Sequence, residues 1–213
     1  MAIINILNID FNTSIVDSTG HYPTINATGS PTLDLSHTVA PTGVGTFHPT
    51  ARYLSIPNFS LGSGDWSFSC KIYLVTTPTL GYGVSFISFG DGIDGTTGFN
   101  LAFFYHSDPE KRIDAHFNYS SAVATGGPVD TGVWIPVKLE KIGGIGYITI
   151  NGVPGGVTSD IHAIDFNTPR TLYIGTGSLS WESPGESDLY IDDVYVTITV
   201  PYSSVYPTLS IIS

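Results

Sequence analysis

The sequence predicts an all-β protein, a β-sandwich or a jelly roll of antiparallel strands joined by short turns. Between Val133 and Leu139 apolar residues alternate with others, which is the period of a strand with one buried face. Gly143-Gly144 and Asn151-Gly152 then supply the positive φ angles of two tight reversals, and Asn-Gly is the strongest short hairpin signal. No window of the sequence combines helical periodicity with good helix formers, so we expect no long helix.

The composition favours one domain with a full hydrophobic core. Apolar residues make up 41% of the 213 residues, and the 24 Gly and 14 Pro suit many short strands and turns. The sequence has neither a linker-like stretch nor an internal repeat. Residues 1–213 are therefore predicted to form a single domain.

The clearest core strand is Asp65–Leu74. Its alternate residues Trp66, Phe68, Cys70, Ile72 and Leu74 fall on one face. This position makes the only cysteine a small buried side chain rather than a reactive thiol, and a single cysteine excludes an internal disulfide. Further strands are predicted at Ala2–Phe11, Arg52–Pro57, Val84–Phe89, Gly98–His106, Lys111–Tyr119, Thr171–Gly175 and Asp188–Val200.

The charge balance narrows the range of partners. The formal net charge is −11, from 7 Lys plus Arg against 18 Asp plus Glu. Such a surface repels a phosphate backbone, so we expect no nucleic-acid partner, whereas acidic loops suit Ca²⁺. The chain begins without the features of a signal peptide and has no apolar run long enough to span a membrane, so we expect a soluble chain that is complete at Met1.

Several segments, in order, carry a family likeness: DFN (10–12), DSTGHYPTINATGSPTL (17–33), RYLSIPNFSLGSGDWSFSCKIYL (52–74), GVWIPVKLEKIGGIGYITINGVPGG (132–156), and LYIGTG with SDLYIDDVYVT (172–197). Together they resemble the laminin-G-like branch of the concanavalin A-like lectin and glucanase jelly rolls. The chain departs from that pattern at Cys70-Lys71-Ile72, which lacks the usual Trp, and at Ile135-Pro136, which replaces a common His pair. The resemblance implies two stacked antiparallel sheets of six or seven strands, one concave and one convex. Members include lectins, glycan-binding modules, glycosidases, adhesion modules and phage virion domains, so it implies a fold more than a function.

Catalysis is not expected. Glycosidases on this fold resemble one another in a strand of closely spaced carboxylates, whereas the four glutamates here are Glu110, Glu140, Glu182 and Glu186. Glu182 and Glu186 sit in a Pro-Gly loop, which does not hold the geometry or the raised pKa of a general acid. The six histidines form no metal-binding or nucleophile motif.

A calcium site is a candidate at Asp192. This residue shares strand parity with Val194 and Val196, which predicts a carboxylate on the core side, where an unpaired charge is costly. The resemblance to calcium-binding glucanases implies Asp10 as its partner ligand around a structural Ca²⁺. Alternatively, Asp192 accepts hydrogen bonds from backbone N–H groups or pairs with Arg52 or Arg170.

A glycan-binding face is a second candidate site. The two strands that begin at Gly98 and Lys111 are predicted to pair, with their polar residues on one side. Aromatic rings stack on sugar rings, and mixed donors and acceptors bind hydroxyls. Alternatively, this is an ordinary solvated sheet face, with Trp181 folded onto its own loop. The candidate residues are Phe104, His106, Arg112, Asp114, His116 and Asn118, with Tyr82 and Trp181 at the rim.

Taken together, the sequence favours a non-catalytic protein on the virion surface of a phage: a capsid decoration, or a tail- or fibre-associated domain, that binds host or environmental glycans. Met1–Ile9 and Pro201–Ser213 would then contact identical copies or other virion proteins. The alternative is an extracellular carbohydrate-binding module of a secreted bacterial protein. A virion protein is expected to assemble, and a binding module to be monomeric.

Overall fold

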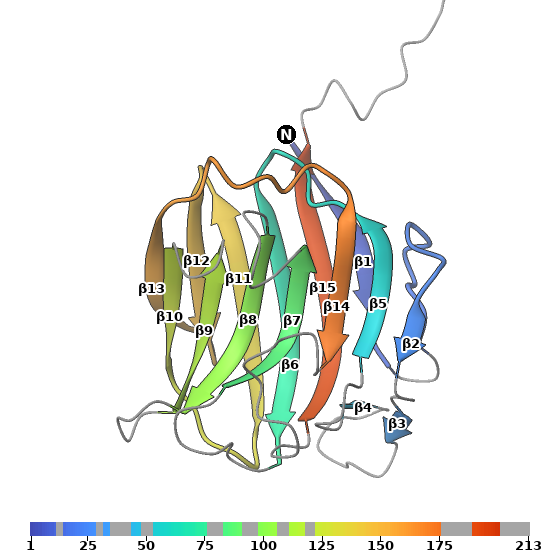
Figure 1. The fold of residues 1–213 in the computed structure, drawn as a ribbon, viewed down its shortest axis with the longest axis vertical. Helices are drawn as coiled ribbons and strands as arrows, with labels where there is room; N and C mark the ends of the chain where they lie inside the picture. Colours follow the sequence, from blue (N-terminus) through green and yellow to red (C-terminus); the bar gives the residue numbers. More distant parts are fainter. Residues whose placement is uncertain are drawn as a thin grey trace, which may run out of the picture.

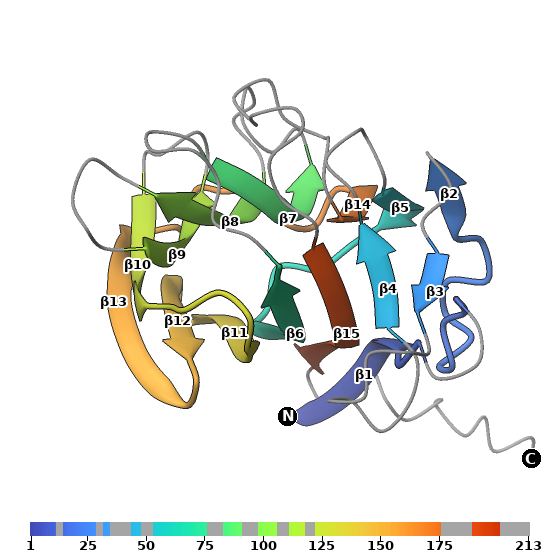
Figure 2. The same ribbon diagram turned by 90° about the horizontal axis from the view of Figure 1, so that it is seen from below.

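The computed structural model describes residues 1–11, 15–28, 32–34, 44–47, 53–75, 83–90, 98–105, 111–117, 122–175 and 189–200. Within these residues the chain forms fifteen β-strands and no helix, as the sequence predicted. No described segment is therefore a helix that could cross a membrane. The strands build two antiparallel sheets, of eight and seven strands, that face each other (Figures 1 and 2).

The first sheet, called sheet A, contains the first and the last described strands. At its centre β11 (Trp134–Ile142) lies beside β6 (Trp66–Leu74), with Ile135 opposite Ile72 and Val137 opposite Cys70. The two segments with the clearest alternation in the sequence are therefore neighbours. The order is β13 (Val153–Asp160), β12 (Ile145–Ile150), β11 (Trp134–Ile142), β6 (Trp66–Leu74), β15 (Leu189–Val200), β4 (Val44–Phe47) and β3 (Thr32–Asp34), and β1 (Ala2–Ile9) also pairs with β15.

The second sheet, called sheet B, contains the predicted pair of strands, β8 (Gly98–Tyr105) and β9 (Lys111–Phe117). The register places Phe99 opposite Phe117, Leu101 opposite Ala115 and Phe103 opposite Ile113, and all six side chains are buried, which confirms the predicted pairing of these two strands. The order in this sheet is β10 (Ala122–Pro128), β9 (Lys111–Phe117), β8 (Gly98–Tyr105), β7 (Gly83–Gly90), β14 (Arg170–Gly175), β5 (Tyr53–Phe59) and β2 (Asn26–Thr28).

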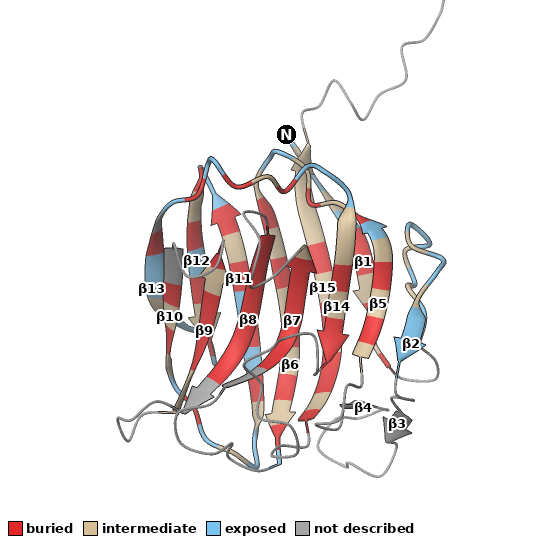
Figure 3. Cartoon of the chain, in the orientation of Figure 1, coloured by how far each residue is buried: buried red, intermediate tan, exposed pale blue. Residues whose placement is uncertain are grey.

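The core lies between the two sheets and is rich in aromatic rings. Buried and less buried residues alternate along the central strands (Figure 3). Trp66 of sheet A stacks on Phe99 of sheet B with ring centroids 5.4 Å apart, and Phe166 packs against Trp66 at 5.2 Å. Cys70 lies in this core, and burial raises the pKa of its thiol, as expected for a structural cysteine.

Both tight reversals are formed as predicted. Gly143 and Gly144 have φ angles of 55° and 79° between β11 and β12, and Asn151 and Gly152 have φ angles of 52° and 75° between β12 and β13. Positive φ at both central positions is the mirror-type turn that matches the twist of paired strands. The turns bring Val137 and Leu139 opposite Ile150 and Ile148.

β1 belongs to the core instead of forming a free terminus. Its residues Ile6, Leu7 and Ile9 are buried, while Met1 and Ile3 are 79% and 77% exposed. Only the start of this segment therefore offers apolar side chains to a partner. The other proposed assembly terminus, Pro201–Ser213, lies outside the described residues.

Candidate functional site

Sheet B carries a row of polar residues across its outer face. Ser88 of β7 lies opposite Asn100 of β8, which lies opposite His116 of β9. In the adjacent rows, Asp114 lies opposite Ala102 and Arg112 opposite Phe104. The predicted polar side of the two strands is thus a continuous band on one face of the sheet.

Much of this band is buried. Asn100 and Ser85 are 0% exposed, and the Ser85 hydroxyl donates a hydrogen bond to Asn100 Oδ1 at 2.8 Å. Asp114 is 1% exposed, and its Oδ2 accepts a hydrogen bond from Arg112 Nε at 2.9 Å. Asp114 therefore orients the half-buried Arg112, and direct contact between Asp114 and a glycan would require the band to open.

The side chains of the other residues predicted for this face lie outside the part of the chain that the structure describes. The structure places the backbone of Phe104 on β8 but does not describe its side chain, and His106, Asn118, Tyr82 and Trp181 lie outside the described residues. Arg112 and His116 are the two predicted glycan contacts that the structure describes as partly exposed. Sheet B as a glycan site stays a prediction.

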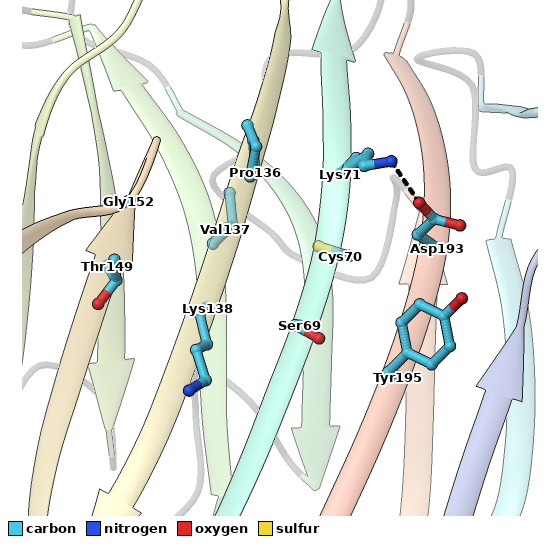
Figure 4. A pocket seen from close by; sticks show the side chains of 10 residues that line it. All are labelled: Ser69, Cys70, Lys71, Pro136, Val137, Lys138, Thr149, Gly152, Asp193 and Tyr195. Atoms are coloured by element: carbon cyan, nitrogen blue, oxygen red, sulfur yellow. Dashed lines mark ion pairs between the residues drawn. The ribbon is translucent and has the colours of Figure 1, made fainter. Parts of the chain in front are cut away.

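Sheet A bears an open hollow on its outer face, of about 320 Å³, which the sequence reasoning missed. β6 forms its floor, because the outward side chain of Ser69 is short, whereas Lys138 on one neighbouring strand and Tyr195 on the other are long. This hollow is called the β6 furrow (Figure 4). Its lining residues are Ser69, Cys70, Lys71, Pro136, Val137, Lys138, Thr149, Gly152, Asp193 and Tyr195.

The polar groups of the β6 furrow are arranged in pairs. Lys71 and Asp193 form an ion pair at one end, and Tyr195 lies beside them (Figure 4). The hydrogen bond from Lys71 to Asp193 raises the pKa of the Lys71 ammonium. Lys138 Nζ lies 2.7 Å from Glu140 Oε1 on the same strand. The furrow therefore offers paired donors and acceptors beside an aromatic ring.

A β-bulge at Asp193 builds this end of the furrow. Asp193 has a φ of 51°, and the pairing of β15 with β6 shifts register between Asp192 and Tyr195. The extra residue directs the Asp193 side chain to Lys71, while Val194 remains in the core. A period-two pattern cannot reveal this extra residue. Buried and outward residues alternate on both sides of the bulge, but the alternation is displaced by one residue between them.

Because of the bulge, the predicted orientation of Asp192 is wrong. The parity prediction placed its carboxylate on the core side, but Asp192 lies opposite Lys71, in the outward-facing set of β6. The residue is nevertheless only 3% exposed, and its Oδ1 accepts a hydrogen bond from the N–H of Asp193 at 2.8 Å. Such a bond to a backbone N–H is the alternative that the sequence left open.

Asp10 and Asp192 lie close enough for their charges to interact. Burial raises the pKa of Asp192 to about 6, and the negative charges of Asp193 and Asp10 act in the same direction. Ca²⁺ takes roughly six to eight oxygen ligands, and these two carboxylates supply part of such a set. Among the described residues no cluster of three or more His, Cys, Asp or Glu side chains could hold a metal ion, so the Ca²⁺ site stays a prediction.

No protein-family model matches the chain, and no curated protein matches it in sequence. Solved structures do match the fold. The botulinum neurotoxin serotype G binding domain aligns with a TM-score of 0.67 at 14% identity, over 95% of this chain and 50% of that one. The binding domain of Paraclostridial Mosquitocidal Protein 1 aligns with a TM-score of 0.68 at 8% identity, over 94% and 50%.

A third similar structure is the binding domain of botulinum neurotoxin serotype D/C VPI 5993, with a TM-score of 0.66 at 14% identity, over 94% of this chain and 50% of that one. The chain thus spans about half the length of these solved proteins. At such low identity the similarity supports the all-β sandwich, and the laminin-G-like assignment stays a prediction.

Proposed function

We propose that this chain is a non-catalytic carbohydrate-binding domain and that the β6 furrow holds the saccharide. The observation that supports this proposal is that the Tyr195 ring, the Lys71–Asp193 ion pair and the Ser69 hydroxyl surround one open hollow. A sugar ring presents an apolar face to an aromatic side chain and hydroxyls to paired donors and acceptors. The furrow brings one aromatic ring and these paired groups to the same open surface.

Two further observations support binding over catalysis. The structurally similar proteins are described as binding domains. Of the four glutamates, Glu140 is the one within the described residues, and it forms an ion pair with Lys138. A carboxylate held by a lysine is a poor general acid, because the positive charge favours its ionised form.

For the biological setting we propose the exterior of a phage virion, where a glycan-binding domain would contact a host or environmental surface. The Lys-poor composition with a net charge of −11 motivates this setting. The alternative is an extracellular carbohydrate-binding module of a secreted bacterial protein. Light scattering on the purified chain separates the two, because a virion component is expected to form a defined oligomer and a binding module to stay monomeric.

The partly exposed Arg112 and His116 on sheet B form a second candidate glycan site. A glycan array with matched variants separates it from the furrow. Tyr195→Ala is expected to abolish the array signal, whereas Tyr147→Ala, which removes an exposed tyrosine from the same outer face of sheet A, keeps it. Loss of signal in His116→Ala but not in Tyr195→Ala would assign the site to sheet B. An array without any signal would contradict carbohydrate binding.

A further inference from the structure

We infer that the saccharide is an uncharged linear oligosaccharide that lies along β6, rather than a single terminal sugar. This inference rests on the proposed function of the β6 furrow and concerns the length, the direction and the charge of its ligand. Three features of the outer face of sheet A carry it: an aromatic row beyond one end of the furrow, a second hollow beyond the other end, and no excess of positive charge between them.

The aromatic row crosses three strands next to the Lys71 end. Trp134 of β11 lies opposite Tyr73 of β6, which lies opposite Tyr190 of β15. The ring centroids are 5.6 Å apart for Trp134 and Tyr73, and 5.8 Å apart for Tyr73 and Tyr190. All three residues are partly exposed on the outer face. The rings are inclined to one another by 59° and 70°, so the row offers separate aromatic surfaces beyond Lys71, against which a further sugar ring can pack.

The second hollow continues the floor of the furrow in the opposite direction. It contains Ser67, the next outward residue of β6, between Glu140 of β11 and Thr197 of β15. Lys138 lines both hollows. The two hollows are therefore parts of one track, in which short serine side chains follow each other along β6 and longer residues flank them.

The length of this track exceeds that of one sugar. From Tyr73 to Ser67 the strand covers six residue steps, which is about 20 Å at ~3.3 Å per residue. The hydroxyls of Ser67 and Ser69 and the two ion pairs repeat along it at the spacing of outward side chains. A linear chain of sugar rings presents hydroxyls repeatedly along its length, and it can occupy such a track throughout.

Charge favours an uncharged ligand. Along the track, Lys71 faces the carboxylates of Asp193 and Asp192, and Lys138 faces that of Glu140, so the track has no excess of positive charge. The whole chain carries a net charge of −11, which disfavours an acidic polysaccharide. Paired charges keep their hydrogen-bonding capacity toward hydroxyls, because each carboxylate accepts and each ammonium donates more than one hydrogen bond.

The test measures how affinity depends on the length of the saccharide. The probes are neutral glucan, mannan and xylan oligomers, from the monosaccharide to the hexasaccharide, titrated calorimetrically against the full chain. We expect affinity to rise stepwise along the series for one sugar type. Trp134→Ala is expected to lower the affinity for the hexasaccharide about tenfold and to leave the affinity for the shortest oligomer that binds unchanged. Ser67→Tyr, which fills the second hollow from an outward position, is expected to act in the same way.

Three results would overturn the inference, and they differ in what else they contradict. Equal affinity for the monosaccharide and the hexasaccharide would refute an extended site but leave carbohydrate binding intact. Binding of none of the neutral oligomers at any length, with binding of an acidic glycan, would refute the uncharged ligand. A concentration-dependent dimer that Ser67→Tyr abolishes would show that a second copy of the chain fills the track, and it would contradict the proposed function as well.

Discussion

The carboxylate of Asp17 accepts a hydrogen bond from the backbone N–H of Asn8 at 3.0 Å, which fastens the turn after β1 to the outer edge of that strand. The same side chain accepts from the N–H of Thr19 at 3.0 Å and from the N–H of Tyr22 at 2.9 Å. Thr19 Oγ1 donates to Ile6 O at 3.2 Å. The turn thereby occupies polar groups that an edge strand otherwise exposes to other chains.

Replacement of Asp17 by Ala is expected to lower the free energy of unfolding by about 2 kcal/mol, since a charged acceptor for several backbone donors is lost. Burial of Asp17 opposes ionisation, but the hydrogen bonds from Tyr22, Thr19 and Asn8 outweigh it and lower its pKa. Its stabilising effect is therefore present above the ordinary pKa of an aspartate and is lost as the pH falls through the lowered value. Urea unfolding at neutral and acidic pH measures this, with the exposed Asp130→Ala as control. Equal losses in the two variants would contradict the role of Asp17.

Asp192 is expected to produce the opposite pH dependence. Its pKa in the folded protein is about 6, above the ordinary 3.8, so the folded state holds the proton more tightly than the unfolded chain. The resulting stability is fully present below pH ~4 and is lost as the pH rises through ~6. Asp192→Asn is therefore expected to be more stable than the wild type at neutral pH by about 1–2 kcal/mol, a value reduced for solvent screening near the surface. Melting curves between pH 4 and pH 8 test this, and parallel pH profiles for both proteins would contradict it.

A Ca²⁺ ion bound by Asp10 and Asp192 would change stability in a way that differs from the pH effect of Asp192 alone. A bound cation would remove the cost of the buried charge at neutral pH and stabilise the folded state by mass action. Addition of Ca²⁺ is then expected to raise the melting temperature of the wild type, chelation to lower it, and neither to affect Asp192→Asn. A wild-type melting temperature that is the same with calcium and with chelator would contradict a Ca²⁺ site at Asp10 and Asp192.

At one side of the sandwich, glycines allow the backbones of β10 and β13 to come close together. A Cβ on Gly126 would lie 2.3 Å from the carbonyl oxygen of Ile113 and 2.8 Å from Ile150 Cγ1, whereas a Cβ on Gly127 would meet no atom within 4 Å. Gly126→Ala is therefore expected to destabilise the protein by about 1–3 kcal/mol through overpacking. Gly127→Ala is the matched control in the same strand. Equal unfolding midpoints for the two variants in urea would contradict this packing.

The same glycines show why parts of the fold could not be predicted. β6 and β11 were predictable because each buries one face, and burial of one face imposes a period of two on the sequence. β10, with the sequence AVATGGP, and β13, with VPGGVTSD, lack that period, because glycines occupy the positions where the two backbones come close to their neighbours. Such contacts depend on which strand lies opposite, and only the folded chain determines this.

The candidate sites divide in a similar way. The polar side of β8 and β9 was predictable from alternation, but the burial of Asp114 was not, since it depends on what covers the sheet. The β6 furrow needs Ser69, Pro136 and Tyr195, which lie far apart in the sequence and meet only through the order β11, β6, β15. The bulge at Asp193 adds an ion pair that no local pattern shows.

Saccharide binding in the β6 furrow is tested by calorimetric titration of the saccharide identified on the glycan array against the wild type and Ser69→Trp. This substitution fills the floor of the β6 furrow from an outward position and leaves the buried face of β6 unchanged. At least a tenfold loss of affinity is expected in the variant, with a melting temperature close to that of the wild type. Unchanged affinity in a folded Ser69→Trp protein would contradict binding in the furrow, because the saccharide would then bind elsewhere.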